Sequence, residues 1–372
     1  MLLVIIYLRI RTMNHNLLYL QTINFLENAI KTGQYLPGDV LPSDIDLAKM
    51  RGVSITTVRR AYQDLVRRGW VRRIKKKGTV LNDISQPTIP KKIGIILVSD
   101  TPPFARIFAG INSVLSTLGI PFIKLYNHDR HEDNEKALQH CLNNEFTGLV
   151  VIPPDPNSSE LLRKLSVDGF PVVLISRYGE NFHCVYPDDH KCGYLVGEHF
   201  LACHFRHPAA IYRDKPFSYE RLYGFREALA LGGLRLPDER TLAVSFEDVQ
   251  IINHNDFCER ETNWLLSLQP RPDAVFVFND HYASGIYHRL IHLGIRVPDD
   301  IAIAGVDNLP QTQQPFPITT VDSGLEKVGI LATQILLELH HTKPVSYIKE
   351  KISPSLVVRS STQVLRPQVM VG

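Results

Sequence analysis

The first part of the chain, up to residue 82, alternates helical hydrophobic patterns with turn residues. Between residues 14 and 32 the apolar positions lie three and four apart, which predicts a helix. A short helix is expected behind Ser43 and a longer one behind Ser54, because serine oxygens cap free backbone N–H groups. Two short strands, 70–74 and 78–81, follow. Helix, helix, turn, helix and hairpin together predict a winged helix-turn-helix.

The pattern changes after residue 92. Short, wholly apolar runs now alternate with amphipathic helical stretches, at 93–98, 149–152, 172–175, 209–212, 274–278 and 301–306. Strands that are apolar on both faces are typical of parallel sheets covered by helices on both sides. The stretch is longer than one doubly wound lobe needs, so we expect two α/β lobes with a cleft between them. The chain is expected to cross between the lobes three times, near residues 186–188, 299–300 and 322–326.

These patterns predict five regions. The start, Met1 to Leu8, is apolar but short and resembles neither a signal peptide nor a membrane anchor. The regions are a loose extension or mis-called start (1–12), a winged helix-turn-helix domain (13–82), a linker (83–92), a two-lobed domain (93–362), and a tail (363–372). The linker contains two prolines and no hydrophobic periodicity.

Charge is distributed unevenly between these regions. Residues 13–92 hold 14 lysines and arginines against 6 aspartates and glutamates, whereas residues 93–372 hold 25 against 32. A basic head on an acidic body is expected when one part of a protein meets a polyanion and the other does not.

Composition narrows the class of protein further. Hydrophobic residues make up 44% and charged residues 21%, as in soluble globular proteins. No apolar tract approaches the roughly 20 residues that span a bilayer. The 5 cysteines form no CxxC pair, which is typical of reduced thiols in a cytosol. We therefore expect a cytoplasmic protein with no membrane partner.

The helix behind Ser54 carries the candidate DNA-reading side chains. Val58, Tyr62 and Leu65 share one apolar face, so the polar residues between them project elsewhere. Arginine reaches guanine edges in a major groove, and helix N-termini and lysines bind phosphate. The residues expected at DNA are Ser43, Ser54, Thr56, Thr57, Arg59, Arg60, Gln63, Lys75, Lys76, Lys77 and Gly78. A merely solvated helix face is the alternative, and the complete order of elements argues against it.

This part of the chain resembles the GntR family of regulators. The resemblance lies in Gly33–Ser43 (GQYLPGDVLPS), Leu47-Ala48, Val53-Ser54, Thr56–Arg59, Leu65, Gly69 and Gly78-Thr79. It implies that Thr56, Thr57 and Arg59 contact an operator. Ile45 and Ile55 stand where the family commonly has arginine, so we expect an operator sequence that differs from the usual one, with Arg60 compensating in part.

From residue 93 to about 362 the chain resembles the effector domain of the LacI family, which is similar to periplasmic sugar-binding proteins. The segments that carry this resemblance are 104–105, 110–111, 221–229 (RLYGFREAL), 272–280 (PDAVFVFND), 294–308 (GIRVPDDIAIAGVDN), 319–321 and 357–362. The implied fold is a two-lobed, doubly wound, periplasmic-binding-protein-like α/β domain. A GntR-type head on such a body resembles the architecture of arabinose repressors.

The resemblance also implies where a ligand binds, namely between the lobes at the carboxyl ends of strands. Phe104 would stack on an apolar ligand face, Arg221 would bind ligand oxygens, and Asp280 would accept from hydroxyls; this combination suits a sugar. Further lining candidates are Ser99, Asp100, Arg106, Ser176, Arg177, Asp188 and Tyr282. The alternatives are a helix cap for Asp280, a surface ion pair with Glu220 or Glu227 for Arg221, and packing for Phe104. Asp307-Asn308 is interpreted as a structural turn.

No catalytic or metal-binding motif was found, so we expect no enzyme, no cofactor and no metal. His199, Cys203, His204 and His207 gather at one helix end, but no second pair completes four zinc ligands. The predicted function is a repressor whose homodimer places two heads on a palindromic DNA operator under control of a small-molecule effector. The alternatives are a nucleobase-responsive repressor and a solute-binding protein without a DNA role. Pro103 beside Phe104, where purine sensing would favour paired aromatics, favours the sugar.

Overall fold

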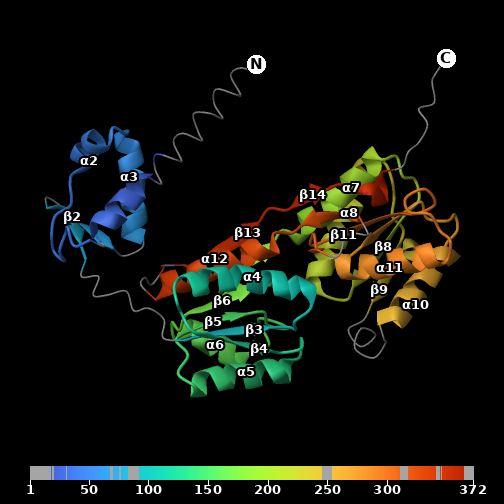
Figure 1. The fold of residues 1–372 in the computed structure, drawn as a ribbon, viewed down its shortest axis with the longest axis horizontal. Coiled ribbons are helices and arrows are strands. Elements are labelled where there is room, and N and C mark those ends of the chain that lie inside the picture. The colour runs from blue at the N-terminus through green and yellow to red at the C-terminus, as the bar shows by residue number, and fades with distance from the viewer. Residues whose placement is uncertain are drawn as a thin grey trace, which may run out of the picture. The chain divides into compact units, whose positions relative to one another are not determined.

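The computed structural model describes residues 18, 21–30, 32–67, 70–74, 77–82, 92–244, 254–310, 317–340, 344 and 346–363 (Figure 1). The chain forms two compact units, one of residues 1–91 with 335–347 and one of residues 92–334 with 348–372. None of the helices described is long and apolar enough to cross a membrane.

The first unit contains the predicted winged helix-turn-helix. Residues 21–30 are helical, and α2 (Asp44–Arg51), α3 (Ile55–Arg67) and the antiparallel pair β1 (Val71–Ile74) and β2 (Gly78–Leu81) follow. Ser43 caps α2, because its Oγ accepts a hydrogen bond from the Asp46 amide at 3.2 Å. Ser54 Oγ accepts from the Thr57 amide at 3.1 Å at the head of α3. Between the helices Gly52 has a φ of +63°, a left-handed turn that favours glycine.

The apolar face of α3 lies in the core of this unit. Val58, Tyr62 and Leu65 are fully buried and pack with Leu26, Leu47 and Val71. The Tyr62 hydroxyl donates to the Pro42 carbonyl at 2.7 Å, which joins α3 to the segment before α2. Helical spacing along α3 therefore leaves its opposite face to solvent.

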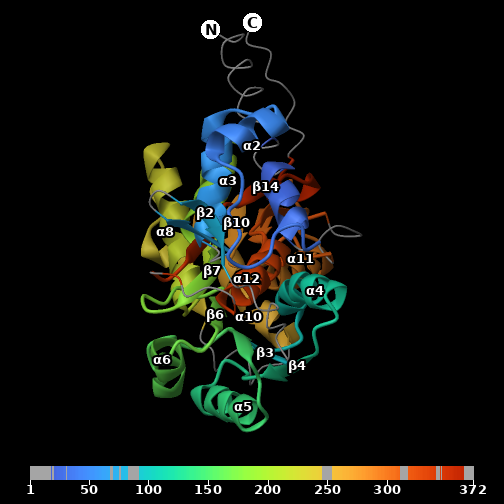
Figure 2. The same cartoon turned by 90° about the vertical axis from the view of Figure 1, so that its left-hand side faces the viewer.

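The second unit contains two lobes, each built on a six-stranded sheet. In the first lobe the strand order is β13-β7-β6-β5-β3-β4, and all neighbours are parallel. Helices α5 and α6 cover one face, where Leu138, Leu162 and Leu174 share a core, and Figure 2 shows both helices on the side away from α4. The elements are β3 (Ile93–Leu97), α4 (Pro102–Thr117), β4 (Phe122–Tyr126), α5 (His131–Asn143), β5 (Gly148–Val151), α6 (Glu160–Val167), β6 (Val172–Ile175), β7 (His183–Pro187) and β13 (Lys349–Ile352).

In the second lobe the order is β14-β12-β11-β10-β8-β9, and only β14 is antiparallel to its neighbour. Helices α7 and α8 cover one face of this sheet, and α10 and α11 cover the other. The elements are α7 (Asp189–Ala202), β8 (Pro208–Arg213), α8 (Pro216–Leu231), β9 (Thr241–Val244), α10 (His254–Ser267), β10 (Ala274–Val277), α11 (Asp280–His292), β11 (Ala302–Val306), β12 (Thr319–Asp322) and β14 (Ser355–Val357).

The chain crosses between the lobes three times, and one predicted crossover was wrong. Two crossings, between β7 and α7 and between β12 and α12 (Leu325–Leu339), agree with the prediction. The third lies at 353–354, between β13 and β14, and not at 299–300. Residues 299–300 join α11 to β11, which pairs with β10 in the same sheet. A turn sequence shows where the chain reverses but not which sheet the next strand joins.

Candidate ligand cleft and DNA-reading surface

The second unit contains a cavity of about 380 Å³ between its two lobes. It lies at the carboxyl ends of β3, β4 and β6 in the first lobe and of β8, β10 and β11 in the second. Carboxyl ends of parallel strands meet at one edge of each sheet, so both lobes present loops to the same space. The lining consists of Val98, Ser99, Thr101, Pro103, Phe104, Ile107, His128, Asp129, Ser176, Arg177, Pro187, Asp189, Arg213, Phe217, Arg221, Asn279, His281, Tyr282, Asp307 and Leu325.

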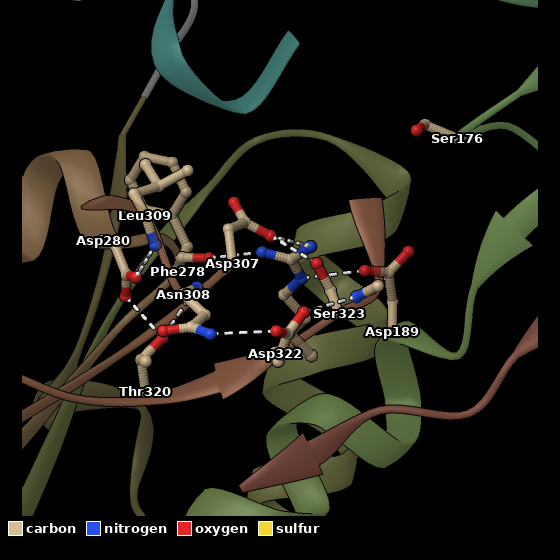
Figure 3. Close-up of polar contacts among 12 residues, drawn as sticks. Ser176, Asp189, Phe278, Asp280, Asp307, Asn308, Leu309, Thr320, Asp322 and Ser323 are labelled. Carbon is tan, nitrogen blue, oxygen red and sulfur yellow. Dashed lines mark hydrogen bonds and ion pairs between the residues drawn. The ribbon is translucent and has the colours of Figure 1, made fainter. Parts of the chain in front are cut away.

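Arg221 is held in the wall of the cavity by three oxygens. Its Nε donates to Asp189 Oδ1 at 2.8 Å, one terminal nitrogen donates to the Phe278 carbonyl at 2.6 Å, and the other to Asp307 Oδ1 at 3.4 Å. Figure 3 shows Asp189, Asp307 and Phe278 converging on this point. Burial alone would lower the pKa of the guanidinium, but the two carboxylates raise it above its usual value. Arg221 is thus a fixed, fully charged donor group.

Phe217, at the start of α8, has two arginines close to its ring. The guanidinium carbons of Arg177 and Arg221 lie 5.3 Å and 5.2 Å from the centre of its ring. Burial lowers the pKa of Arg177, and the nearby carboxylate of Asp129 opposes that shift. The cavity therefore offers an aromatic face together with oriented cations, which is the chemistry that binds a polar ring with several hydroxyls.

The cavity lining contains six of the ten side chains predicted for it, namely Ser99, Phe104, Ser176, Arg177, Arg221 and Tyr282. Asp100, Arg106, Asp188 and Asp280 lie outside the described lining. Each of these four side chains instead has partners within the protein.

Asp280 is fully buried and faces the sheet instead of the cavity. Its Oδ1 accepts from the Thr320 hydroxyl at 2.7 Å, and its Oδ2 accepts from the Leu309 amide at 2.8 Å. The preceding residue, Asn279, caps α11 and lines the cavity. Asp280 therefore fixes the loop behind the cleft, with its carboxylate already satisfied from within the protein.

The other three predicted residues are also held elsewhere. Asp188 caps α7 by accepting from the Lys191 amide at 3.1 Å, and the next residue, Asp189, lines the cavity in its place. Asp100 pairs with Lys124 at 2.9 Å on the surface. Arg106 of α4 donates to the Asp307 and Asn308 carbonyls, at 2.6 Å and 2.9 Å, and so joins the two lobes.

Sequence reasoning missed several lining residues. Asp129, Asp189 and Arg213 each stand just after a strand or at its end, and that position was the available signal. Asp307 was interpreted as a structural turn. It has a φ of +102° and also accepts from the Ser323 hydroxyl at 2.8 Å, so it combines a turn with a place in the cavity wall.

On the first unit, α3 presents Thr56, Arg59, Arg60 and Gln63 to solvent. Thr57 differs, because it is only 5% exposed and its hydroxyl lies 2.8 Å from Ser54 Oγ. Of the predicted wing residues, Lys77 and Gly78 are exposed. Lys75 and Lys76 lie outside the described residues.

Two arginines of this surface share one carboxylate. Arg59 Nε donates to Asp44 Oδ2 at 3.1 Å, and Arg73 of β1 donates to Asp44 Oδ1 at 2.7 Å. The two arginine side chains remain 63% and 47% exposed, whereas that of Asp44 is 15% exposed. Arg73 was not among the predicted DNA residues. Both guanidiniums are thereby oriented on one surface between α3 and the wing.

The histidine and cysteine group has a structural arrangement. His199 Nε2 lies 2.7 Å from Thr362 Oγ1 and 3.7 Å from Cys203 Sγ. Among the residues that the structure describes, no set of three or more histidine, cysteine, aspartate or glutamate side chains could hold a metal ion.

A winged head and a two-lobed cleft together define a class of protein, the ligand-binding DNA-binding regulators. Residues 18–81 match the model of bacterial regulatory proteins, gntR family, and residues 198–362 match that of the periplasmic binding protein-like domain. The chain thus carries a GntR-type head and a periplasmic-binding-protein-like body, which is the organisation of a DNA-binding transcription regulator and agrees with the predicted architecture.

The chain is also similar to whole proteins over most of their length. The chain is 28% identical over 369 residues to the arabinose metabolism transcriptional repressor of Halalkalibacterium halodurans, covering 91% of this chain and 96% of that protein. It is 25% identical to the ribose operon repressor of the same organism, covering 86% and 96%. The fold matches a LacI family transcriptional regulator from Enterococcus faecium with bound ribose, with a TM-score of 0.63 at 22% identity, covering 73% of this chain and 98% of that one.

Proposed function

We propose that this protein is a transcription repressor whose operator binding is controlled by a sugar that occupies the cavity between the lobes. The observation that carries the proposal is the set of groups converging there: a buried, oriented Arg221, carboxylates from both lobes, and the aromatic rings of Phe104 and Phe217. Planar charged groups suit neighbouring hydroxyls, and rings suit the C–H faces of a sugar.

The relatives support this assignment. Their names describe repressors of arabinose metabolism and of a ribose operon, and the Enterococcus faecium regulator holds ribose. An enzymatic role has no support from them, because they are transcriptional regulators.

We propose further that residues 13–82 form the DNA-binding domain, 83–92 a linker, and 93–362 the sensing and dimerisation domain. In this proposal two heads of a homodimer bind a palindromic operator in the cytoplasm. Thr56, Arg59, Arg60 and Gln63 would face the DNA, and their exposure on α3 supports this. A ligand controls such a protein only if it binds the operator-competent and the released states with different affinity.

The proposal is tested with the purified full-length protein and DNA from the region upstream of its own gene. Fluorescence anisotropy would measure operator affinity alone and with L-arabinose, D-ribose or hypoxanthine. We expect specific binding that one of the two sugars weakens and that hypoxanthine leaves unchanged. Binding no tighter than to random duplex, or a response to hypoxanthine alone, would refute the sugar-responsive repressor.

A further inference from the structure

Asp129 is a buried carboxylate where the two lobes meet. It follows β4 in the first lobe with a left-handed backbone, φ +57°, and its side chain is 2% exposed. Its Oδ2 lies 2.8 Å from Lys215 Nζ and 3.7 Å from a terminal nitrogen of Arg213. Lys215 and Arg213 belong to the second lobe, at the start of α8 and the end of β8. The ion pairs of Asp129 therefore cross the cleft.

Asp129 Oδ1 has different partners from Oδ2. In the described part of the chain no donor makes a hydrogen bond to its Oδ1, and the terminal nitrogen of Arg177 lies 3.9 Å away. Ser176 Oγ, directly after β6 of the same sheet, is likewise buried without a hydrogen-bond partner among these residues. Asp129 and Ser176 both line the cavity. Buried polar atoms in proteins nearly always have a hydrogen-bond partner, so groups of this kind call for an explanation.

The backbone at these positions points to a function. Asp129 and Ser176 both have positive φ values, +57° and +55°, which residues other than glycine seldom adopt. Strain of this kind persists where the surrounding structure holds a side chain in a particular direction, and it is common at ligand sites. Here it occurs at two residues that line the same cavity.

We propose that Asp129 is the ligand contact that couples sugar recognition to closure of the cleft. Its Oδ1 accepts a hydrogen bond from a ligand hydroxyl, Ser176 Oγ bonds the same region of the ligand, and its Oδ2 holds Lys215 of the opposite lobe. A ligand held by Oδ1 while Oδ2 pairs with Lys215 connects the two lobes through one carboxylate, so the ligand favours the closed arrangement of the lobes. This inference rests on the proposed function, because it takes the ligand to be a sugar.

The test separates binding from coupling in the full-length protein. Calorimetry would measure the affinity for L-arabinose and D-ribose, and anisotropy the ratio of operator affinity without and with each sugar. The variants are Asp129→Asn, Ser176→Ala and Lys215→Met. Lys191→Met, an exposed lysine of the same lobe whose Nζ lies 3.9 Å from Glu198, is the control.

Asp129→Asn should lower sugar affinity about ten- to a hundredfold, because a charge-assisted hydrogen bond is lost, and Ser176→Ala about three- to tenfold. Lys215→Met should keep sugar affinity within about tenfold of the wild-type value. It should bring the ratio of operator affinity without sugar to that with sugar close to one. Lys191→Met should match the wild type in both measurements.

Sugar affinity within twofold of wild type in both Asp129→Asn and Ser176→Ala would overturn the ligand contact. If Asp129→Asn does not fold, Ser176→Ala decides the matter, because it removes only a hydroxyl that makes no hydrogen bond to any residue described in the structure. A wild-type operator ratio in Lys215→Met would show that the cluster only supports the fold and would overturn the coupling. No sugar response in the wild type would instead overturn the proposed function together with this inference.

Discussion

Arg221 of α8 and Asp189 of α7 form an ion pair with a 2.8 Å hydrogen bond, between side chains that are 6% and 12% exposed. The pair joins the two helices that cover one face of the second lobe, at the edge where the cavity lies. Asp307, after β11, provides the second carboxylate at 3.4 Å. A ligand oxygen that meets Arg221 therefore meets a guanidinium whose direction is already set, and little entropy is lost in orienting it.

Substitution of Arg221 by lysine should separate charge from orientation. Lysine keeps the positive charge but cannot reproduce the planar arrangement of donors. We expect the sugar concentration needed for operator release to rise at least about tenfold, while operator affinity without sugar stays within about twofold. Anisotropy titrations would measure both quantities. A response of Arg221→Lys equal to that of the wild type would show that the guanidinium does not contact the ligand.

Substitution of Gly193 by alanine should damage the contact between α7 and α8. A Cβ at this position would lie 1.7 Å from the Arg221 carbonyl oxygen, which is backbone and cannot simply turn away. Overpacking of this kind costs about 1–3 kcal/mol. We expect a lower melting temperature of the second unit and a weaker sugar response, measured by calorimetry and anisotropy. The control is Leu231→Ala at the end of α8, where the leucine is 72% exposed. This substitution should change the free energy of unfolding by less than about 0.5 kcal/mol.

His183 should make stability depend on pH. Burial lowers its pKa from 6.5 to about 4, and its Nδ1 accepts from the Ile348 amide at 3.0 Å. Because the folded pKa lies below the unfolded value, the unfolded chain binds more protons between pH 4 and 6.5. The contribution of neutral His183 is thus fully present above pH 6.5 and is lost as the pH falls towards 4.

We expect this residue to account for about 1–2 kcal/mol of the loss of stability across that window, after allowance for solvent screening. His183→Asn keeps an acceptor near the Ile348 amide but cannot be protonated there, so its stability should change less with pH. Urea denaturation at several pH values would measure the difference. His292→Asn, at an exposed site on α11, should follow the wild type. A profile of His183→Asn as steep as that of the wild type would contradict the assignment.

Arg59 should be needed for specific operator binding. Its side chain is 63% exposed and is oriented by Asp44, so the Arg59→Ala variant should lose about 1–3 kcal/mol if Arg59 reads a base. The melting temperature should hardly change, because an exposed ion pair contributes about 0–1 kcal/mol. Gel shifts with operator and random duplexes would measure the loss of preference. Arg130→Ala, on the sensing body, is the control. Equal operator affinity of Arg59→Ala and wild type would refute the role.

The strands that could be predicted from the sequence are buried in the middle of the sheets. Strands in the middle of each sheet, such as β5 and β10, are apolar on both faces and were predicted from their hydrophobic runs. Strands at the sheet edges were not predicted, and one reason is that such a strand can mix charged with apolar residues. β13, with the sequence KEKI, is an example. The identical strand order of the two lobes left no repeat in the sequence, since different side chains satisfy the same packing.

In the candidate cleft, too, some residues were predicted from the sequence and others were not. Phe104 and Arg221 were predicted from their resemblance to family motifs and line the cavity. Asp280 was predicted in the same way but bonds Thr320 and Leu309 inside the lobe. Asp129 was missed, because nothing near it in the sequence indicates that Lys215, far along the chain, lies against its carboxylate.

The amino-acid sequence alone determined the winged head, its exposed basic helix and the alternating α/β body, because local periodicity, capping and turn chemistry depend on neighbouring residues. Only the tertiary structure decided which carboxylates line the cavity, where the chain crosses between the lobes for the third time, and which oxygen of Asp129 has no hydrogen-bond donor among the described residues. These features depend on contacts between residues far apart in the chain, and such contacts leave no pattern of spacing in the sequence.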